Sequence, residues 1–251
     1  MKDNKTQPAA QTAESSLTTP RKVIHLICQA KGGVGKSFFT YLVYHKYKHD
    51  SSVAYLDLDN TNQTTLSRLK DKARSFNVLD TKKKINREAF LALIENISIA
   101  KAKDIFWVDM GATESIEFVN MLTQSYPADV LKEEFDQLGI DLHFDVIIAG
   151  GDVYTACIKF LRELSQAVSG AFPITCWINI GRFNAELDKD YLHQIEQFTT
   201  DNISVKQFGS TENEQSDAQL IELIKNGTEI DPARLSLATR IKYRRLISEI
   251  E

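Results

Sequence analysis

The feature that most constrains this chain is a glycine-rich loop between a strand-length apolar run and a helical pattern. The run covers residues 23–28, and the segment AKGGVGKS follows it at residues 30–37. Glycines let backbone N–H groups converge on a polyphosphate, and the helix that begins here points its positive end at the same anion. A strand, such a loop and a helix in direct succession therefore predict a phosphate-binding P-loop.

Individual side chains of this loop have expected roles. Lys36 is placed to reach the β- and γ-phosphates of a nucleotide, and the Ser37 hydroxyl is placed to ligate Mg²⁺. The predicted nucleotide-contacting residues are Gly32, Gly33, Val34, Gly35, Lys36, Ser37 and Phe38. One position departs from the general P-loop pattern, because Ala30 stands where that pattern has glycine. The alternative is a glycine-rich turn that binds nothing, and the strand–loop–helix context disfavours it.

Strand-length and helix-length patterns alternate along the rest of the chain. The further apolar runs cover residues 53–58, 104–110, 144–150, 174–180 and, more weakly, 203–208. The helical patterns cover residues 36–49, 87–101, 113–138 with a break near Pro127, 153–168, 184–198, 214–226 and about 235–250. Several runs are apolar on both faces, as strands inside a parallel sheet are. We therefore expect an α/β fold: a doubly wound, mostly parallel sheet with helices on both faces, the three-layer arrangement of a P-loop NTPase.

Composition sets the expected domain organisation and setting. Of 251 residues, 43% are apolar and 25% charged, which is typical of a globular chain, and we expect one domain over residues 21–251. Residues 1–20 carry one large aliphatic side chain, which predicts a disordered tail. Three widely spaced cysteines fit a reducing, cytoplasmic setting and favour neither a disulfide framework nor a structural zinc site. The longest apolar runs are too short to span a membrane, so a membrane partner is not expected.

The loop carries one further distinctive residue, Lys31, directly before its glycines. The sequence KGGVGKS resembles the deviant Walker A motif of the ParA/MinD-type ATPases, and the order of motifs over residues 23–210 resembles that family too. Similarity to the TraL-like branch from conjugative plasmids looks closest, because an Asp-x-Asp…Asn-x-Thr segment follows the loop at residues 57–64. The resemblance implies ATP and Mg²⁺ as cofactors and an ATP-dependent homodimer in which Lys31 reaches the partner's nucleotide.

Acidic residues end two of the long apolar runs. Asp57 and Asp59 end the run at 53–58, and Asp109 ends the run at 104–110. The carboxyl ends of strands face the crevice where α/β sheets bind ligands, and a carboxylate there is able to orient an attacking water. The resemblance implies that Asp59 positions that water, that Asp57 supports the Mg²⁺ shell and that Asp109 is the Walker B acid. A helix N-cap is the alternative role for Asp59, and Asn60 and Thr61 replace the Pro and Gln usual in the family.

The segment CWINIGRF carries the expected base-binding residues. The resemblance implies that Asn179 reads the adenine edge, which an amide does as both donor and acceptor, and that Arg182 stacks on the base. A strand-end turn residue is the alternative role for Asn179. Because no NKxD guanine motif stands here, we expect ATP to be preferred over GTP.

Charged and amphipathic segments leave several alternatives open. Residues 68–87 contain eight basic and two acidic residues, a net charge of +6, whereas the whole chain has −4. This segment predicts either a surface for nonspecific DNA or a solvated face. The C-terminal helical pattern predicts a packed helix, a partner surface or a membrane-surface helix. His45 and His49 have the i, i+4 spacing of zinc ligands, but no third ligand accompanies them, which favours a solvated helix face.

Together these patterns predict a cytoplasmic, Mg²⁺-dependent ATPase with slow hydrolysis. By resemblance, Lys31, Lys36 and Asp59 act in catalysis, and the ATP-bound dimer positions cargo such as plasmid DNA or a conjugation apparatus. The alternative is a nucleotide-gated adaptor that recruits a partner protein, with hydrolysis incidental. Replacement of Asp59 by Ala separates the two, because an adaptor keeps its function in the ATP-bound state.

Overall fold

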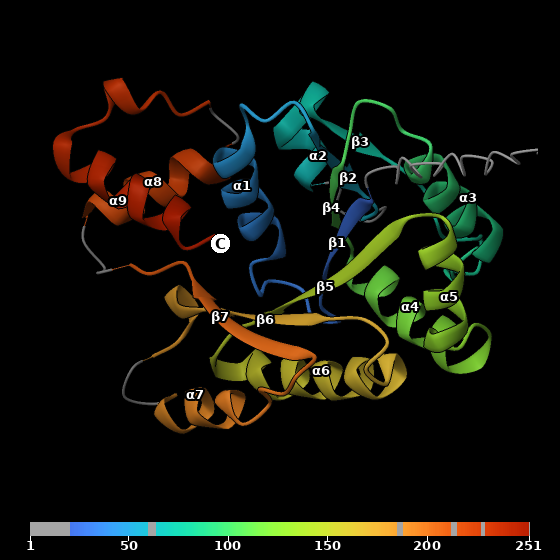
Figure 1. Ribbon diagram of the computed structural model, residues 1–251. Helices are drawn as coiled ribbons and strands as arrows, with labels where there is room; N and C mark the ends of the chain where they lie inside the picture. Colours follow the sequence, from blue (N-terminus) through green and yellow to red (C-terminus); the bar gives the residue numbers. More distant parts are fainter. Residues whose placement is uncertain (1–20, 60–63, 185–187, 212–214, 227–228, 251) are drawn as a thin grey trace, which may run out of the picture.

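A computed structural model describes residues 21–59, 64–184, 188–211, 215–226 and 229–250 (Figure 1). The predicted disordered tail, residues 1–20, lies outside these ranges, as do Asn60 and Thr61. Among the described helices, none has the length and apolar character needed to cross a membrane.

The middle layer of the described chain is a parallel sheet. Its strands are β1 (Lys22–Cys28), β2 (Val53–Asp57), β3 (Ala73–Ser75), β4 (Ile105–Asp109), β5 (Ile140–Ile148), β6 (Ile174–Asn179) and β7 (Ile203–Phe208). They lie in the order β3-β2-β4-β1-β5-β6-β7, and each neighbouring pair is parallel. Parallel neighbours need crossover connections, which the intervening helices supply.

Helices cover both faces of this sheet. The α-helices are α1 (Lys36–Tyr47), α2 (Thr64–Leu69), α3 (Arg87–Ser98), α4 (Ala112–Gln124), α5 (Ala128–Gln137), α6 (Tyr154–Val168), α7 (Lys189–Glu196), α8 (Gln215–Lys225) and α9 (Leu237–Ser248). Short 3₁₀ turns are η1 (Lys70–Lys72), η2 (Gly151–Val153), η3 (Ile180–Arg182) and η4 (Pro232–Arg234). Helix α1 packs with α8 and α9, whereas α6 packs with α4 and α5, and Figure 1 shows α6 and α7 across the sheet from α8 and α9. The predicted three-layer α/β/α fold is confirmed.

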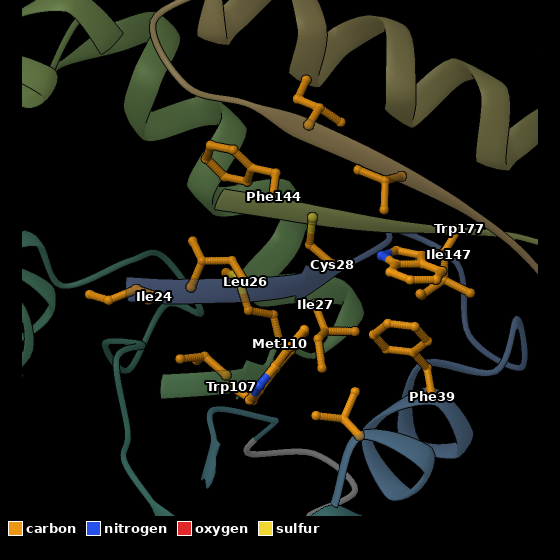
Figure 2. Packing of buried hydrophobic residues seen from close by; sticks show 14 of the residues in the cluster. Ile24, Leu26, Ile27, Cys28, Phe39, Trp107, Met110, Phe144, Ile147 and Trp177 are labelled. Carbon is orange, nitrogen blue, oxygen red and sulfur yellow. The ribbon is translucent and has the colours of Figure 1, made fainter. Parts of the chain in front are cut away.

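The first strand and helix form the centre of the core. Ile24 and Ile27 of β1 are fully buried between β4 and β5. The ring of Phe39 from α1 lies against both core tryptophans, with centroids 6.1 Å from Trp107 and 4.8 Å from Trp177 (Figure 2). Such aromatic packing fixes the start of α1 over the sheet, and with it the loop that joins β1 to α1.

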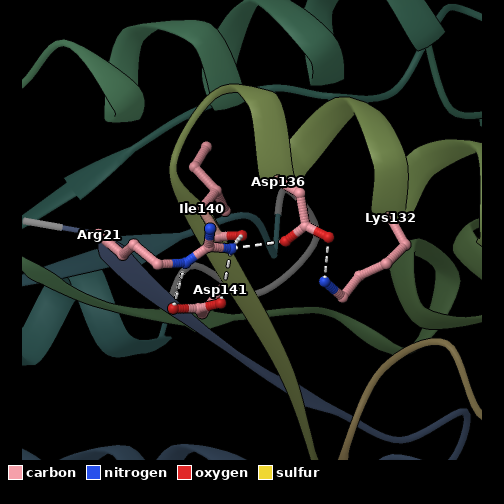
Figure 3. A network of polar contacts seen from close by, with 5 residues as sticks. All are labelled: Arg21, Lys132, Asp136, Ile140 and Asp141. Carbon is pink, nitrogen blue, oxygen red and sulfur yellow. Dashed lines mark hydrogen bonds and ion pairs between the residues drawn. The ribbon is translucent and has the colours of Figure 1, made fainter. Parts of the chain in front are cut away.

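The opposite end of β1 is held by a charged network. The Arg21 guanidinium donates to Asp141 at 2.8 Å and to Asp136 at 2.6 Å, and Lys132 pairs with the same Asp136 (Figure 3). These groups are partly exposed, so each pair contributes little to stability on its own. The network joins the start of β1 to β5 and α5, far from the glycine-rich loop.

The described elements agree with most of the predicted ones, and the differences have physical causes. The predicted break near Pro127 is confirmed, since α4 ends at Gln124 and α5 begins at Ala128. The sequence patterns assign no strand or helix range between residues 60 and 86, although an N-cap role for Asp59 implies a helix there, and the structure has α2 and β3 in this region. Both are short, and β3 is an edge strand with little apolar content. The solvated face predicted for His45 is wrong, because His45 is buried against Tyr243.

Candidate nucleotide-binding site

The loop after β1 has the backbone shape that its glycines predict. Gly33 and Gly35 have φ angles of +78° and +109°, in the left-handed region that glycine adopts most readily. Val34 between them is fully buried and anchors the loop to the core. Gly35 is also the N-cap of α1, so the backbone N–H groups of the first helical turn open into the loop.

Lys36 lies at the centre of this loop. Its ammonium Nζ donates to the backbone carbonyl of Gln29 at 3.2 Å and approaches that of Lys31 at 3.5 Å. The carbonyls of Gln29 and Lys31 thus hold the Lys36 ammonium inside the loop, which is the expected binding place of the phosphates. A cation and converging N–H groups make this loop suited to bind a polyphosphate.

Gln29 fixes the start of the loop, and the sequence patterns did not assign it a role. Its side chain is fully buried; the amide nitrogen donates to Ile147 O at 2.9 Å, and the amide oxygen accepts from Ala30 N at 2.8 Å. The backbone N–H of Gln29 also donates to the hydroxyl of Ser115 at 3.1 Å. The loop is therefore tied to β5 and to α4. A polar residue directly after a buried strand was the available signal.

Lys31 differs from Lys36 in its surroundings. It is exposed, and among the described residues its ammonium has neither a hydrogen bond nor an ion pair. A lysine on the rim of an anion-binding loop without a partner of its own is available to a group outside this chain.

Carboxylates line the adjacent strand ends. Asp57 and Asp109 face each other in register at the ends of β2 and β4, and both are almost fully buried. Asp57 Oδ1 accepts the backbone N–H of Asp59 at 2.9 Å, which fixes the turn that carries Asp59. Burial, with a smaller contribution from the charges of Asp57 and Asp59, raises the pKa of Asp109 to about 6, and the Thr65 hydroxyl and Lys36 oppose this rise.

A further buried acid lies beside these residues. Glu114 lies in the first turn of α4 and is fully buried. A Cβ added to Gly111 would overlap the Glu114 carboxylate and would lie 3.0 Å from the Asp59 carboxylate. Gly111 thus lets the turn after β4 approach Asp59 closely. The sequence patterns missed Glu114; the signal was an acid in a first helical turn, where the helix dipole favours it.

The base side of the site is assembled from other strands. Asn179, at the end of β6, is buried, and its amide donates to Val34 O at 2.9 Å; Arg182 donates to Gly33 O at 2.9 Å. A pocket of about 280 Å³ lies here. Its lining residues are Gly33, Gly35, Phe38, Asn179, Gly181, Arg182, Gly209, Thr211 and Ile221. The predicted base-binding residues and the predicted phosphate loop therefore share one wall.

All predicted site residues lie at the carboxyl edge of the sheet, around the loop at residues 29–36. Ligand crevices of open α/β sheets occur at this edge, where connections leave toward opposite faces. Among the described residues, no group of three His, Cys, Asp or Glu side chains is arranged to hold a metal ion. Mg²⁺ bound with a nucleotide takes several ligands from phosphates and water, so Ser37 and one carboxylate fit the predicted role.

Comparison with known sequences finds two similar TraL proteins of Escherichia coli. One is 27% identical over 158 residues, which is 62% of this chain and 62% of that protein. The other is 22% identical over 232 residues, which is 91% of this chain and 93% of that protein. The chain thus spans less than two thirds of the first TraL protein and almost all of the second. No protein-family model matches the chain.

Comparison with solved structures finds the same fold in nucleotide-bound proteins. A plasmid partition protein from Borrelia burgdorferi bound to AMPPNP has a TM-score of 0.51 and 15% identity, with 92% of this chain and 98% of that chain covered. An ATP complex of a variant of McdA from Cyanothece has a TM-score of 0.50 and 11% identity, with coverage of 92% and 97%. This chain is similar in sequence to the TraL proteins and has the three-layer α/β/α fold of a P-loop NTPase.

Proposed function

We propose that this chain is a Mg²⁺-dependent ATPase of the ParA/MinD type. ATP binding drives formation of a homodimer, and slow hydrolysis returns the dimer to monomers. The observation that carries the proposal is the loop at residues 29–36, in which Lys36 lies among loop carbonyls while Lys31 is exposed on the rim. Two lysines in such different surroundings support two different roles.

ATP binds with its phosphates along the loop. Lys36 and the loop N–H groups contact the β- and γ-phosphates, and the Ser37 hydroxyl and Asp109 bind Mg²⁺ directly or through water. The raised pKa of Asp109 supports this role, because burial makes its charged carboxylate costly even beside Lys36, and a bound Mg²⁺ would lower that cost further.

Hydrolysis uses the turn at the end of β2. Asp59 is partly exposed and its backbone N–H is fixed by Asp57, which supports a role for its carboxylate in orienting a water toward the γ-phosphate. Asp57 supports the Mg²⁺ shell. The water attacks the γ-phosphorus, the bond to the β-phosphate oxygen breaks, and ADP and phosphate leave.

Dimerisation completes each site. Lys31 of one protomer contacts the nucleotide of its partner, where its charge stabilises the negative charge on the phosphates. This arrangement makes hydrolysis depend on dimer formation. Asn179 and Arg182, which line the pocket beside the phosphate loop, recognise the adenine base and give ATP preference over GTP.

The cargo of such a dimer is plasmid DNA or a conjugation apparatus, and nonspecific DNA contacts residues 68–87. Lys72 and Arg74 of this segment line a groove of about 690 Å³ at the β2–β3 edge, together with Lys101. Arg74 and Lys101 have no ion-pair partner among the described residues. A groove with such cations suits phosphate contacts, and steep loss of DNA retention between about 50 and 200 mM salt tests this part of the proposal.

The test of the ATPase itself is binding of Mg²⁺–ATP and release of phosphate by the full chain. Lys36→Ala weakens ATP affinity about 10- to 100-fold, the size of a lost hydrogen bond to a charged group. Lys101→Ala, at an exposed lysine of the groove proposed for DNA, is the matched control and leaves ATP affinity unchanged when DNA is absent. Equal affinity in wild type and Lys36→Ala contradicts the proposal. ATP binding without hydrolysis in the wild type favours the adaptor alternative.

A further inference from the structure

The C-terminal helix α9 is anchored to α1 and α8 by buried polar contacts. The hydroxyl of Tyr243 is hydrogen-bonded to His45 Nδ1 of α1 at 3.0 Å, and Lys242 pairs with the buried Asp217 of α8 at 3.0 Å. Burial lowers the pKa of His45 to about 4, so this histidine is neutral at pH 7 and shares a neutral hydrogen bond with the Tyr243 hydroxyl. Figure 1 shows α8 and α9 beside α1. The end of α9 is therefore held in a defined place.

That end places Glu249 against the loop after β7. Its Oε2 accepts the backbone N–H of Gly209 at 2.7 Å and approaches that of Ser210 at 3.3 Å. Gly209 has φ +76°, and successive N–H groups in such a turn converge on one anion. Hydrogen bonds from backbone N–H groups to a carboxylate are stronger than neutral ones, so Glu249 fixes this loop with respect to α9.

The same loop is a wall of the base pocket. Gly209 and Thr211 line it, and the Cα of Gly209 lies so close to Asn179 that an added Cβ would be 2.9 Å from the Asn179 Oδ1. Gly181 also lies close to this loop, since a Cβ added to it would be 2.7 Å from Gly209 O. The position of Gly209 therefore limits where the Asn179 amide lies.

We propose that Glu249 is a positioning residue for base recognition. It holds Gly209 and Ser210, and through them the Asn179 amide that faces the adenine. This proposal rests on the proposed function, because it takes ATP as the ligand of the pocket. Asn179 also donates to Val34 O, but Lys36 and the start of the phosphate loop are held by contacts of Gln29 and Lys31, so Glu249 affects recognition of the base and leaves recognition of the phosphates unchanged.

The test compares three ligands on the full chain by titration calorimetry with Mg²⁺: ATP, GTP and inorganic tripolyphosphate. Glu249→Ala weakens ATP affinity about tenfold, the size of one lost charge-assisted hydrogen bond. Its preference for ATP over GTP falls toward parity, while tripolyphosphate affinity stays at the wild-type value. Glu249→Gln keeps the shape of the side chain and gives an intermediate effect. Glu222→Ala, an exposed acid on α8, is the matched control and behaves as wild type.

Two results overturn the proposal in distinguishable ways. Unchanged ATP affinity and ATP-to-GTP ratio in Glu249→Ala show that the loop needs no anchor. Equal loss of all three ligands, with a lowered melting temperature in both Glu249 variants, shows that α9 merely supports the fold. Failure of the proposed function looks different, because wild-type protein then binds ATP no better than Lys36→Ala does.

Discussion

The two ends of the candidate site are built in opposite ways. The phosphate end comes from one continuous segment, residues 29–37, and from the ends of the two strands that carry Asp57 and Asp109. The base end comes from β6, η3, the loop after β7 and α8, which meet Gly33, Gly35 and Phe38 of the first loop and helix, with Glu249 of α9 behind them. Binding of a phosphate chain needs a particular local backbone, whereas the base pocket needs several distant segments in register.

The two ends also differ in charge. Lys36, which donates to the carbonyl of Gln29, and the buried Asp109, whose raised pKa the charge of Lys36 opposes, make the phosphate end strongly polar. The base end uses an amide, backbone groups and the ring of Phe38. Substitutions at the phosphate end should therefore change ATP affinity and the rate of hydrolysis by large factors. Substitutions at the base end should change the preference for ATP over GTP by smaller factors.

The largest effect is expected for Lys31. Lys31→Ala lowers the rate of ATP hydrolysis on the order of a hundredfold, the size of losing one group that stabilises charge in the transition state. The ATP affinity of the monomer stays close to the wild-type value, because the Lys31 side chain is exposed on the rim of the loop and does not contact the nucleotide of its own protomer. Phosphate release and calorimetry separate the two quantities. If Lys31→Ala and Lys36→Ala lose ATP binding equally, Lys31 is an ordinary loop residue.

The second effect concerns Asp109 and pH. The pKa of Asp109 is raised from 3.8 to about 6 in the folded state, so the folded state binds this proton more tightly than the unfolded state does. The free energy of unfolding is therefore highest below about pH 4, where both states are protonated, and falls as pH rises through 6, where the buried carboxylate becomes charged. Asp109→Asn removes this loss and increases the free energy of unfolding at pH 8 by on the order of 3 kcal/mol, with a smaller gain at pH 5. Urea unfolding at both pH values measures it.

The same Asp109→Asn variant should lose Mg²⁺-dependent hydrolysis while it gains stability. Asp201→Asn, at an exposed carboxylate in the turn before β7, serves as control and changes neither quantity. If Asp109→Asn is less stable than wild type at pH 8, contacts within the protein already offset the cost of burying the Asp109 carboxylate without Mg²⁺. That result contradicts this account.

The smallest effect is expected at the base end. Asn179→Ala weakens ATP affinity by about tenfold and reduces the preference for ATP over GTP. The reason is that the adenine edge loses its hydrogen bond to the Asn179 amide, and the binding free energy falls by about the strength of that bond. At saturating ATP the hydrolysis rate stays near wild type, so the variant raises KM and spares kcat. A drop in kcat with unchanged KM means that Asn179 supports the P-loop through Val34 instead.

The fold was largely predictable from sequence because buried parallel strands are long apolar runs. Strands β1, β5 and β6 consist mainly of Val, Ile, Leu, Cys and aromatic residues, with single polar residues such as His25, Asp145 and Thr175 between them. Strand β3 was missed because it has three residues and only Ala73 is buried in it. An edge strand of this kind depends on its neighbour β2 for pairing, and no period of hydrophobic residues identifies it.

The site was predictable to the extent that its residues follow strand ends. Asp57, Asp109 and Asn179 each end a strand, so their common edge follows from a parallel sheet. Gln29 and Glu114 were missed because their importance comes from burial against other segments. The contact of Glu249 with Gly209 joins residues 40 positions apart and depends on how α9 packs, which no local pattern specifies.

The most direct test of the central claim is the mass of the Asp59→Ala variant in solution with and without Mg²⁺–ATP. Blocked hydrolysis keeps ATP bound, and ATP favours the dimer by mass action. Light scattering should then show a shift from 28.4 kDa toward twice that mass on addition of ATP, with no shift for Asp59→Ala combined with Lys36→Ala. An unchanged mass under conditions where ATP is bound contradicts ATP-driven dimerisation.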